Sequence, residues 1–470
     1  MLSRSACYER DTLMKFRCFY APLIAACLFF GTSISAQDST APRIQWTGMA
    51  AIEEGQFVKC NYVGDLAPIP FSPWVADEYA EIGVKATLNR HFSLAVIPEI
   101  RLWDDTWDWT RMNSSTGAAN PLNQHATVSL ADAEGILSLG TTDAIAWTIS
   151  GGVIPYKYDL EAKNLGEYLF RTGEHPAYIE TSFDQAYATM TGLRANAEIF
   201  RNLSLDLFFT TETQVQPMND WSLSFLAGYK VPGLVDFGAG IMLDRLIPAV
   251  PLLDKPSTSG YNTYYTSSGQ LDTFSWGGTK VMARLSFDPK GLLPSDLANI
   301  FGKEDGILYG ESAILGVKSI TAYSLELGSN GLPLTPHVFV ADTGNTINNA
   351  YSDIWKRIPV MFGFNFPTFR LLDYLSGELE WFGGTYSPSL YDLEGFKYLL
   401  PLPDGTQYTG SKWKYSINAR KTLYGNFSVI GQIARDHTRH DVYFFGNTDV
   451  DEIFQTKDEW GWWLKLQYDL

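Results

Sequence analysis

The sequence is poor in cysteine, and most of its length lacks a long apolar run. It has four cysteines in 470 residues, and only Cys60 follows the first 36. One cysteine cannot form an internal disulfide, so a disulfide-stapled secreted scaffold is excluded. After residue 36, no apolar run reaches the roughly 18 residues that a transmembrane helix requires. The fold must therefore rest on its architecture, and a membrane crossing would have to use strands.

Basic residues are scarce relative to acidic ones. The chain holds 35 Lys and Arg against 52 Asp and Glu, a formal net charge of −17. A surface that binds nucleic acid carries the opposite sign, so we expect no nucleic-acid partner. Aromatic residues, by contrast, make up 14% of the chain. This composition fits a secreted β protein or a β-barrel that spans a membrane.

The first 36 residues have the features of a signal peptide. Lys15 and Arg17 form a basic region, residues 19–31 are apolar, and Ala36 ends a small-residue cleavage site. Cleavage there would remove four basic and two acidic residues. The remaining residues 37–470 would carry a net charge of −19.

A second interpretation of this segment is lipidation at Cys27. Residues 23–27 have the sequence Leu-Ile-Ala-Ala-Cys, which resembles a lipobox. The apolar stretch continues beyond Cys27, and this favours simple cleavage over a lipid anchor. We predict an exported protein under either interpretation.

Alternation of apolar and polar residues dominates the rest of the chain. In residues 411–421, Trp413 and Ile417 lie on one face of an extended chain, whereas Lys412 and Lys414 lie on the other. Neighbouring side chains of a strand point to opposite faces, so such a segment has one apolar and one charged face. The segments with this pattern, some of them less clear, are 44–53, 78–88, 92–103, 125–139, 143–154, 187–200, 203–213, 221–230, 234–245, 278–288, 307–317, 356–366, 374–385, 411–421, 426–440 and 458–470.

The connections between these segments alternate in length. Residues 201–202 form one of the tight links, and residues 155–186 form one of the long ones. Two links on the tight side contain helix-like pieces, at 294–301 and 369–375. Short turns on one side and long loops on the other are typical of an up-and-down barrel. We therefore predict an all-β fold, a transmembrane up-and-down antiparallel β-barrel of about sixteen strands within residues 37–470.

The last segment supports the barrel independently. Trp462, Leu464, Leu466, Tyr468 and Leu470 occupy every second position up to the last residue given, and Lys465, Gln467 and Asp469 stand between the last four. This resembles the C-terminal strand of bacterial outer-membrane proteins, although that family usually ends in Phe. The resemblance implies insertion by the barrel-insertion machinery, with outer-membrane lipid and lipopolysaccharide as surroundings. A secreted β-sandwich or β-helix also alternates, but sandwich strands are shorter, at about 5–6 residues.

Turned inward, the polar faces would line a lumen. The charged residues predicted to line it are Lys85, Glu99, Arg101, Arg194, Glu198, Asp206, Lys280, Arg284, Glu378, Glu380, Lys412, Lys414 and Arg420. Adding Glu81, Glu212, Glu311, Lys465 and Asp469 makes basic and acidic residues equal in number, so the lumen would be close to neutral. Clustered charges of opposite sign would create a field that favours small polar solutes. Alternatively, the charges only pair with one another and hydrate the wall.

The third long connection, 155–186, is the candidate constriction. Its 32 residues include more Tyr, Phe and Leu than a solvated loop usually carries. Sixteen-stranded general-diffusion porins fold their third external loop into the barrel, and residues 44–470 resemble them in strand number and loop position. The short acidic motif of that porin loop is absent. The constriction residues would be Asp159, Glu161, Lys163, Glu167 and Arg171; the alternative is an ordinary external loop.

Signals for an enzyme are weak. The six histidines show no recognisable pairing with serine, and the densest cluster, 435–441, is better explained as a charged barrel rim. Asn447, Asp449 and Asp451 have the spacing of a calcium loop, but Glu452 stands where a glycine is required. We predict that the chain is not an enzyme and has no cofactor and no dedicated metal site.

The pattern as a whole predicts an outer-membrane, porin-like channel for the passive diffusion of small hydrophilic solutes. By analogy with sixteen-stranded porins, it would form a homotrimer. The alternative is a non-enzymatic surface protein, an adhesin or anchor, whose long loops 104–109 and 261–276 bind a partner or a glycan. Aromatic residues beside carboxylates suit sugar stacking, but they equally suit an aromatic girdle at the membrane boundary.

Overall fold

The structure is a computed structural model. It describes residues 42–60, 74–104, 124–141, 144–171, 188–211, 220–247, 263–273, 278–327, 329, 331–334, 337–341, 353–382, 412–437, 439–444, 447–452, 454 and 457–470. From Arg43 onward the chain belongs to one compact unit. The predicted signal peptide and Cys27 lie outside the described residues, as do Glu212 and most of the loop at 104–109.

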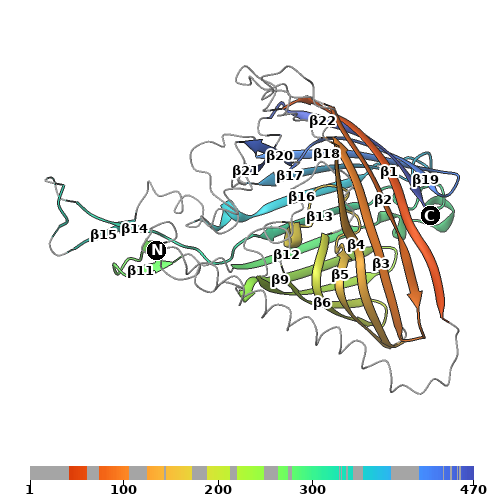
Figure 1. Ribbon diagram of the computed structural model, residues 1–470, viewed down its shortest axis with the longest axis horizontal. Coiled ribbons are helices and arrows are strands. Elements are labelled where there is room, and N and C mark those ends of the chain that lie inside the picture. Colours follow the sequence, from red (N-terminus) through yellow and green to blue (C-terminus); the bar gives the residue numbers. More distant parts are fainter. Residues whose placement is uncertain are drawn as a thin grey trace, which may run out of the picture. The chain divides into compact units, whose positions relative to one another are not determined.

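Sixteen antiparallel strands close into a barrel (Figure 1), which confirms the predicted fold class and strand number. In order around the barrel they are β1 (Arg43–Lys59), β2 (Trp74–Thr87), β3 (Phe92–Asp104), β4 (Gln124–Gly140), β5 (Ile145–Tyr156), β6 (Ala188–Ile199), β7 (Leu203–Thr211), β8 (Trp221–Val231), β9 (Val235–Ile247), β12 (Gly278–Phe287), β13 (Leu308–Ile314), β16 (Pro359–Asn365), β17 (Tyr374–Phe382), β18 (Trp413–Leu423), β19 (Phe427–Arg435) and β22 (Trp460–Asp469). Each strand overlaps one of the sixteen predicted segments.

Closure joins the last strand to the first. β22 pairs antiparallel with β1, beginning with Met49 opposite Asp469, and with β19 on its other side. The barrel sheet therefore has no edge strand, and its backbone groups are paired within the sheet. In the β3–β4 ladder the register shifts between Ile97 and Pro98, where proline has no N–H to donate.

The short connections contain one of the two predicted helical pieces. α4 (Ser295–Ala298) follows the 3-10 turn η2 (Pro289–Leu292), so the helical piece predicted at 294–301 is confirmed. The piece predicted at 369–375 is wrong, because the chain turns there instead. Phe369 and Arg370 have φ angles of 53° and 67°, a left-handed conformation that cannot continue a right-handed helix.

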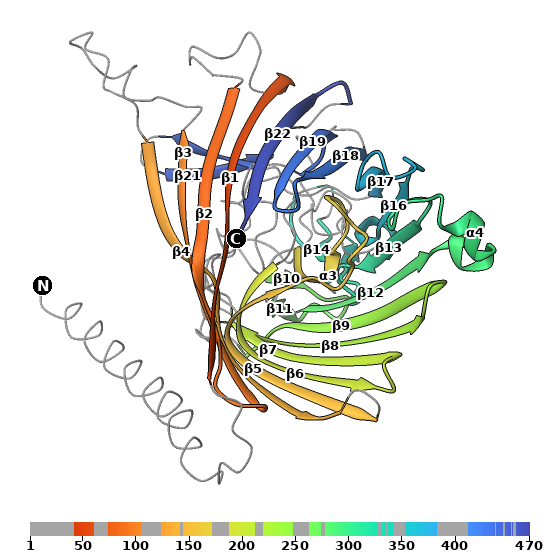
Figure 2. The same cartoon turned by 90° about the vertical axis from the view of Figure 1, so that its right-hand side faces the viewer.

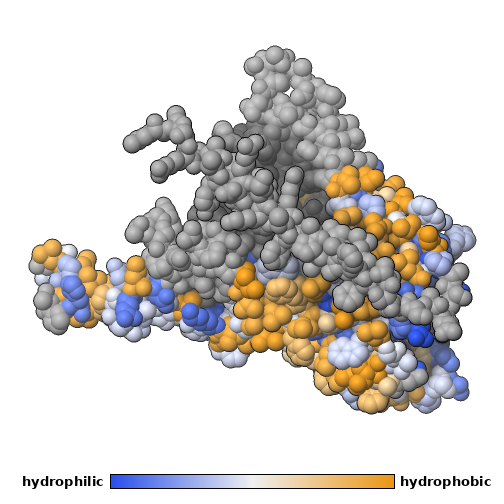
Figure 3. Space-filling model, turned by 60° about the horizontal axis from the view of Figure 1, so that its bottom comes forward, coloured by the Kyte–Doolittle hydropathy of each residue, from blue (hydrophilic) through white to orange (hydrophobic). Residues whose placement is uncertain are grey.

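The barrel wall has two contrasting faces. Large apolar side chains such as Leu207, Phe362 and Ile417 are exposed on the outer face. Figure 3 shows apolar residues covering much of the described surface in that view. The inner face buries charged side chains such as Lys280 and Glu378. An outer surface so rich in apolar side chains, with charges buried inside, is unlike that of a water-soluble protein.

Several long connections contain strands that the sequence patterns did not predict. β10 (Thr263–Tyr265), β11 (Leu271–Thr273), β14 (Tyr323–Leu325) and β15 (Phe339–Ala341) form a four-stranded sheet in the order β11-β10-β14-β15, and β20 (Arg439–Phe444) pairs with β21 (Asn447–Glu452). In Figure 1, β14 and β15 extend away from the barrel strands. The 3-10 turn η3 (Ile354–Arg357) precedes β16. No described helix is both long enough and apolar enough to cross a membrane.

Candidate functional site

Several ion pairs lie on the inner face, most of them between nearby strands. Arg194 Nη2 on β6 lies 2.8 Å from Asp206 Oδ1 on β7, and Lys280 Nζ on β12 lies 3.2 Å from an oxygen of Asp244 on β9. Further pairs are Arg284–Asp236 at 3.0 Å, Arg101–Glu99 at 3.4 Å, Lys85–Asp132 at 3.7 Å and Arg420–Asp469 at 3.8 Å. Each of these cations has a counter-ion on its own or a nearby strand, which weakens any field between opposite walls.

Residues 157–171, which follow β5, lie against the inner face; we name them the inward segment. Glu311 on β13 accepts the backbone N–H groups of Glu167 and Tyr168 at 2.8 Å each and the Tyr158 hydroxyl at 2.5 Å. Gly166 and Glu167 are both left-handed, with φ of 89° and 61°, and the N–H groups of Glu167 and Tyr168 point toward the wall. A Cβ at Gly166 would stand 3.1 Å from Glu311 Oε2, so glycine permits this close approach.

Glu378 on β17 binds the tip of the inward segment in the same way. Its Oε2 accepts the N–H groups of Asn164 and Leu165 at 2.9 and 2.8 Å. Its Oε1 accepts the Lys163 N–H at 2.5 Å and the Tyr309 hydroxyl at 2.9 Å. Three consecutive backbone donors thus converge on one buried carboxylate, and charge-assisted hydrogen bonds of this kind are strong.

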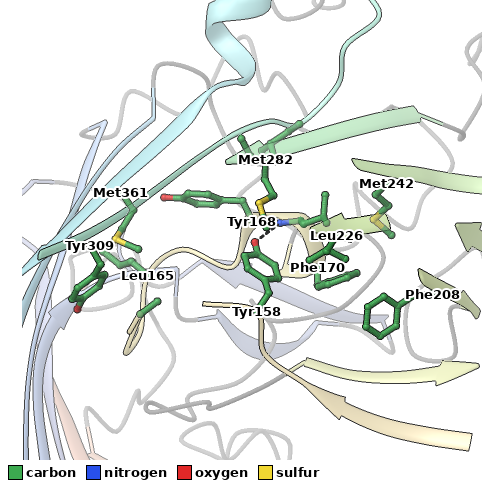
Figure 4. Close-up of a cluster of buried hydrophobic side chains, with 14 of the residues drawn as sticks. Tyr158, Leu165, Tyr168, Phe170, Phe208, Leu226, Met242, Met282, Tyr309 and Met361 are labelled. Atoms are coloured by element: carbon green, nitrogen blue, oxygen red, sulfur yellow. Dashed lines mark hydrogen bonds between the residues drawn. The ribbon is translucent and has the colours of Figure 1, made fainter. Parts of the chain in front are cut away.

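Apolar side chains fill the space between the inward segment and the wall (Figure 4). The segment includes the helical turn α3 (Tyr168–Arg171), and Phe170 packs edge-on against Phe208 of β7 with ring centroids 5.7 Å apart. The buried cluster includes Tyr158, Ala162, Leu165, Tyr168, Leu169 and Phe170 from the segment, and Met190, Phe208, Leu226, Met242, Met282, Tyr309, Ala313, Met361 and Phe382 from the wall. Hydrogen bonds and apolar burial therefore fix the segment together.

A buried polar chain extends from the inward segment to the end of β19. The Tyr168 hydroxyl donates to Glu380 Oε2 at 2.7 Å, and Glu380 Oε1 lies 2.6 Å from His437 Nε2. His437 belongs to the cluster 435–441, which the sequence predicted to be a charged rim. Its side chain is buried instead, because Glu380 of β17 provides a partner inside the barrel.

Charged groups meet at the tip of the inward segment. Lys163 Nζ lies 3.3 Å from Glu304 Oε2 and 4.8 Å from the centre of the Tyr374 ring. Burial, and next the negative charge of Glu304, raises the pKa of Glu161 to about 7, while Lys163 acts in the opposite direction. Asp159 adds a further negative charge to this group. Glu161 is therefore neutral in mildly acidic solution and ionised in mildly alkaline solution.

The predicted site residues fall into three groups. The residues predicted to line the lumen that belong to strands lie on the same face as buried side chains of those strands, which is the inner face. Glu198, one of these residues, is half-buried. Lys412 is exposed just before β18, where its carbonyl accepts the Phe382 N–H at 2.9 Å. Asp159 and Glu167 are buried in the inward segment, and Glu161 and Lys163 are half-buried at its tip. The side chain of Arg171 lies outside the described residues.

Sequence reasoning missed several inner-face residues. Asp236 and Asp244 alternate with the outer-face residues of β9, so the same period-two rule would have found them. Asp132 was hidden by the β3–β4 register shift, which changes which residues of β4 face inward. The wall methionines, such as Met242 and Met282, gave no signal because an inner face was expected to be polar.

Comparisons with known proteins bear on the fold alone. No family model matches the chain, and no curated protein matches it. Solved structures of variants of the Rhodopseudomonas blastica porin are similar to it, with 8% and 10% identity in two cases and TM-scores of 0.41, each covering 91% of this chain and 100% of that one. A third variant has a TM-score of 0.42 at 8% identity. The fold is porin-like. That statement rests on the strand order of the chain itself, and no property of those porins is carried over.

Proposed function

We propose that the chain is an outer-membrane channel for the passive diffusion of small hydrophilic solutes. The observation that carries the proposal is the inverted wall: a closed barrel that exposes apolar side chains outside and gathers charge inside. A charged, hydrated passage favours small polar solutes over lipophilic ones. The proposal includes a cleaved signal peptide, insertion through the C-terminal strand, contact with lipid and lipopolysaccharide, a homotrimer, and neither a cofactor nor catalysis.

Planar-bilayer recording tests the channel directly. We expect the purified protein to produce discrete, ohmic conductance steps, because a lumen with ion pairs along its wall holds water and mobile ions. Protein-free detergent, matched in amount, is the control. A barrel that inserts, as judged by protease protection and heat-modifiable mobility in gels, yet stays electrically silent would refute the channel.

The ion preference of the channel is expected to depend on pH through Glu161. Its raised pKa of about 7 means that the tip of the inward segment gains a negative charge as the pH rises from 6 to 8. The reversal potential in a KCl gradient should therefore move toward cation preference over that range. Glu161→Gln should remove most of this shift, and an equal shift in the variant would show that another group titrates.

A second candidate function is suggested by the four-stranded sheet of β10, β11, β14 and β15. Two long connections contribute to it, and β11 and β15 are its edge strands. Exposed apolar residues of these connections include Tyr265, Leu271 and Val340. Such a structured appendage suits an adhesin or anchor that binds a partner or a glycan outside the cell. Silent barrels in the bilayer recording, together with binding to host or bacterial surfaces that is lost when 263–273 is deleted, would favour this function.

A further inference from the structure

Two connections at one end of the barrel expose a group of large apolar side chains. Residues 289–306 join β12 to β13, and residues 367–373 join β16 to β17; these strands are consecutive in the wall. The exposed residues, which we name the rim platform, are Leu292, Leu293, Leu297, Ile300, Phe369 and Leu371. Their exposed fractions range from 39% to 76%. In Figure 2, α4, which carries Leu297, stands clear of the barrel strands.

A buried carboxylate holds the two connections together. Asp305 accepts the N–H groups of Gly302 and Phe369 at 2.8 Å each and the Thr368 hydroxyl at 3.0 Å. Burial acts to raise the pKa of Asp305, but these hydrogen bonds outweigh it and hold the pKa below its usual range. The Arg370 guanidinium also donates to the carbonyls of Phe301, at 3.2 Å, and Asn299. The rim platform is thus a rigid construction that spans two connections.

A strained turn of the backbone at Phe369 and Arg370 holds an apolar side chain at the surface of the barrel rim. Phe369 and Arg370 are both left-handed, a costly conformation for residues with a side chain. The hydrogen bond from the Phe369 N–H to Asp305 fixes this turn, and the Phe369 ring stacks on Phe301 with centroids 5.5 Å apart while remaining more than half exposed. The turn thus holds the apolar Phe369 ring at the surface, where a partner outside this chain could contact it.

The outer face of the barrel indicates which partner that is. Exposed Leu285 on β12 and exposed Phe362 and Phe366 at β16 lead directly into the connections of the rim platform. The apolar outer face is therefore continuous with the platform. Lys303 is exposed on the first of these connections, where its long basic side chain can reach phosphate groups while apolar neighbours stay in hydrocarbon.

We infer that the rim platform is a membrane-interface anchor that inserts into the phospholipid leaflet at the short-connection end of the barrel. The inference rests on the proposed function, since it takes the outer face to be the lipid-facing one. The apolar side chains of the rim platform lie among the upper acyl segments, with Lys303 at the level of the lipid phosphates. The platform fixes how deep and at what tilt this side of the barrel sits, as interfacial anchors do.

Depth-dependent fluorescence quenching tests the anchor. Leu297→Cys in a Cys60→Ala chain is labelled with an environment-sensitive fluorophore, and mass spectrometry verifies a single label. The protein is reconstituted in phosphatidylcholine vesicles that contain lipids with a nitroxide near the headgroup or deep in the acyl chain. Matched labels at Phe362→Cys, on the outer face, and Ser268→Cys, in the exposed β10–β11 turn, provide the lipid and water references.

We expect the Leu297 label to be quenched severalfold more by the shallow nitroxide than by aqueous iodide, and the Ser268 label to show the reverse. Iodide quenching of the Leu297 label equal to that at Ser268, with Phe362 still quenched by lipid, would overturn the anchor and leave the membrane barrel intact. If the Leu297 label is shielded from both quenchers, and its self-quenching fades on dilution in lipid, the platform contacts a second copy of the chain. That result would also overturn the anchor. Loss of lipid quenching at Phe362 would instead refute the proposed membrane channel.

Discussion

Deleting residues 160–170 is expected to raise single-channel conductance severalfold. The inward segment is docked on the inner face through two wall carboxylates and a buried apolar cluster, so it occupies part of the cross-section through which ions would pass. We expect its removal to widen the lumen, and conductance follows open area. The measurement is the step size in a planar bilayer in KCl, compared with the unmodified chain.

Two matched variants separate the effect of lumen width on conductance from the effect of lumen charge. The deletion uncovers Glu311 and Glu378, so the same deletion combined with Glu311→Gln and Glu378→Gln should keep the large step size but show a weaker cation preference. Glu198→Gln, which neutralises an inner-face carboxylate near the end of β6, should leave the step size nearly unchanged. If the deletion variant inserts normally and conducts like the unmodified chain, the inward segment does not limit the passage.

The sequence predicts the barrel well because the alternation of apolar and polar residues in each strand shows which side chains face outward and which face inward. A strand such as 411–421 alternates Trp413 and Ile417 with Lys414, and the structure exposes the apolar pair on the outer face and buries the lysine on the inner face. Strand order follows from the same information, since consecutive barrel strands pair with each other across the short and the long connections alike. The fold class and the sixteen strands were therefore predictable without any long-range contact.

What covers the inner face was much harder to predict. The Tyr158 hydroxyl reaches Glu311 across 153 positions of the sequence, and the Lys163 N–H reaches Glu378 across 215. Period-two alternation assigns Glu311 and Glu378 to a face, but it carries no information on which backbone groups approach that face. The segment's own composition, rich in Tyr, Phe and Leu, was the only local sign that it packs against something.

The rim platform illustrates a different limit. A helix-like piece was predicted at 369–375, yet the chain there is held in a left-handed turn by Asp305, more than sixty positions earlier. Local propensity favoured a helix, and a tertiary hydrogen bond to a buried carboxylate overrode it. Errors of this kind mark places where distant parts of the chain fix the backbone.

Replacing Glu378 with alanine is expected to accelerate amide hydrogen exchange at residues 163–165 by about a hundredfold. The side chain accepts three backbone N–H groups in a buried setting, and each lost hydrogen bond costs about 1 kcal/mol, or roughly 3 kcal/mol in local opening free energy. Hydrogen exchange of a peptide covering 160–170, measured by mass spectrometry in lipid nanodiscs, reports this change directly.

Control variants show whether the Glu378 carboxylate, rather than the residues packed around it, protects residues 163–165 from hydrogen exchange. Glu378→Gln keeps one acceptor oxygen, so it should accelerate exchange much less than Glu378→Ala, and Glu198→Ala should leave the peptide unchanged. The apolar cluster around Leu169 and Phe170 remains in all three variants, so protection at 168–170 should fall less than at 163–165. Uniform loss of protection over the whole segment would mean that it opens as one unit. Unchanged exchange at 163–165 would mean that the carboxylate does not hold the tip.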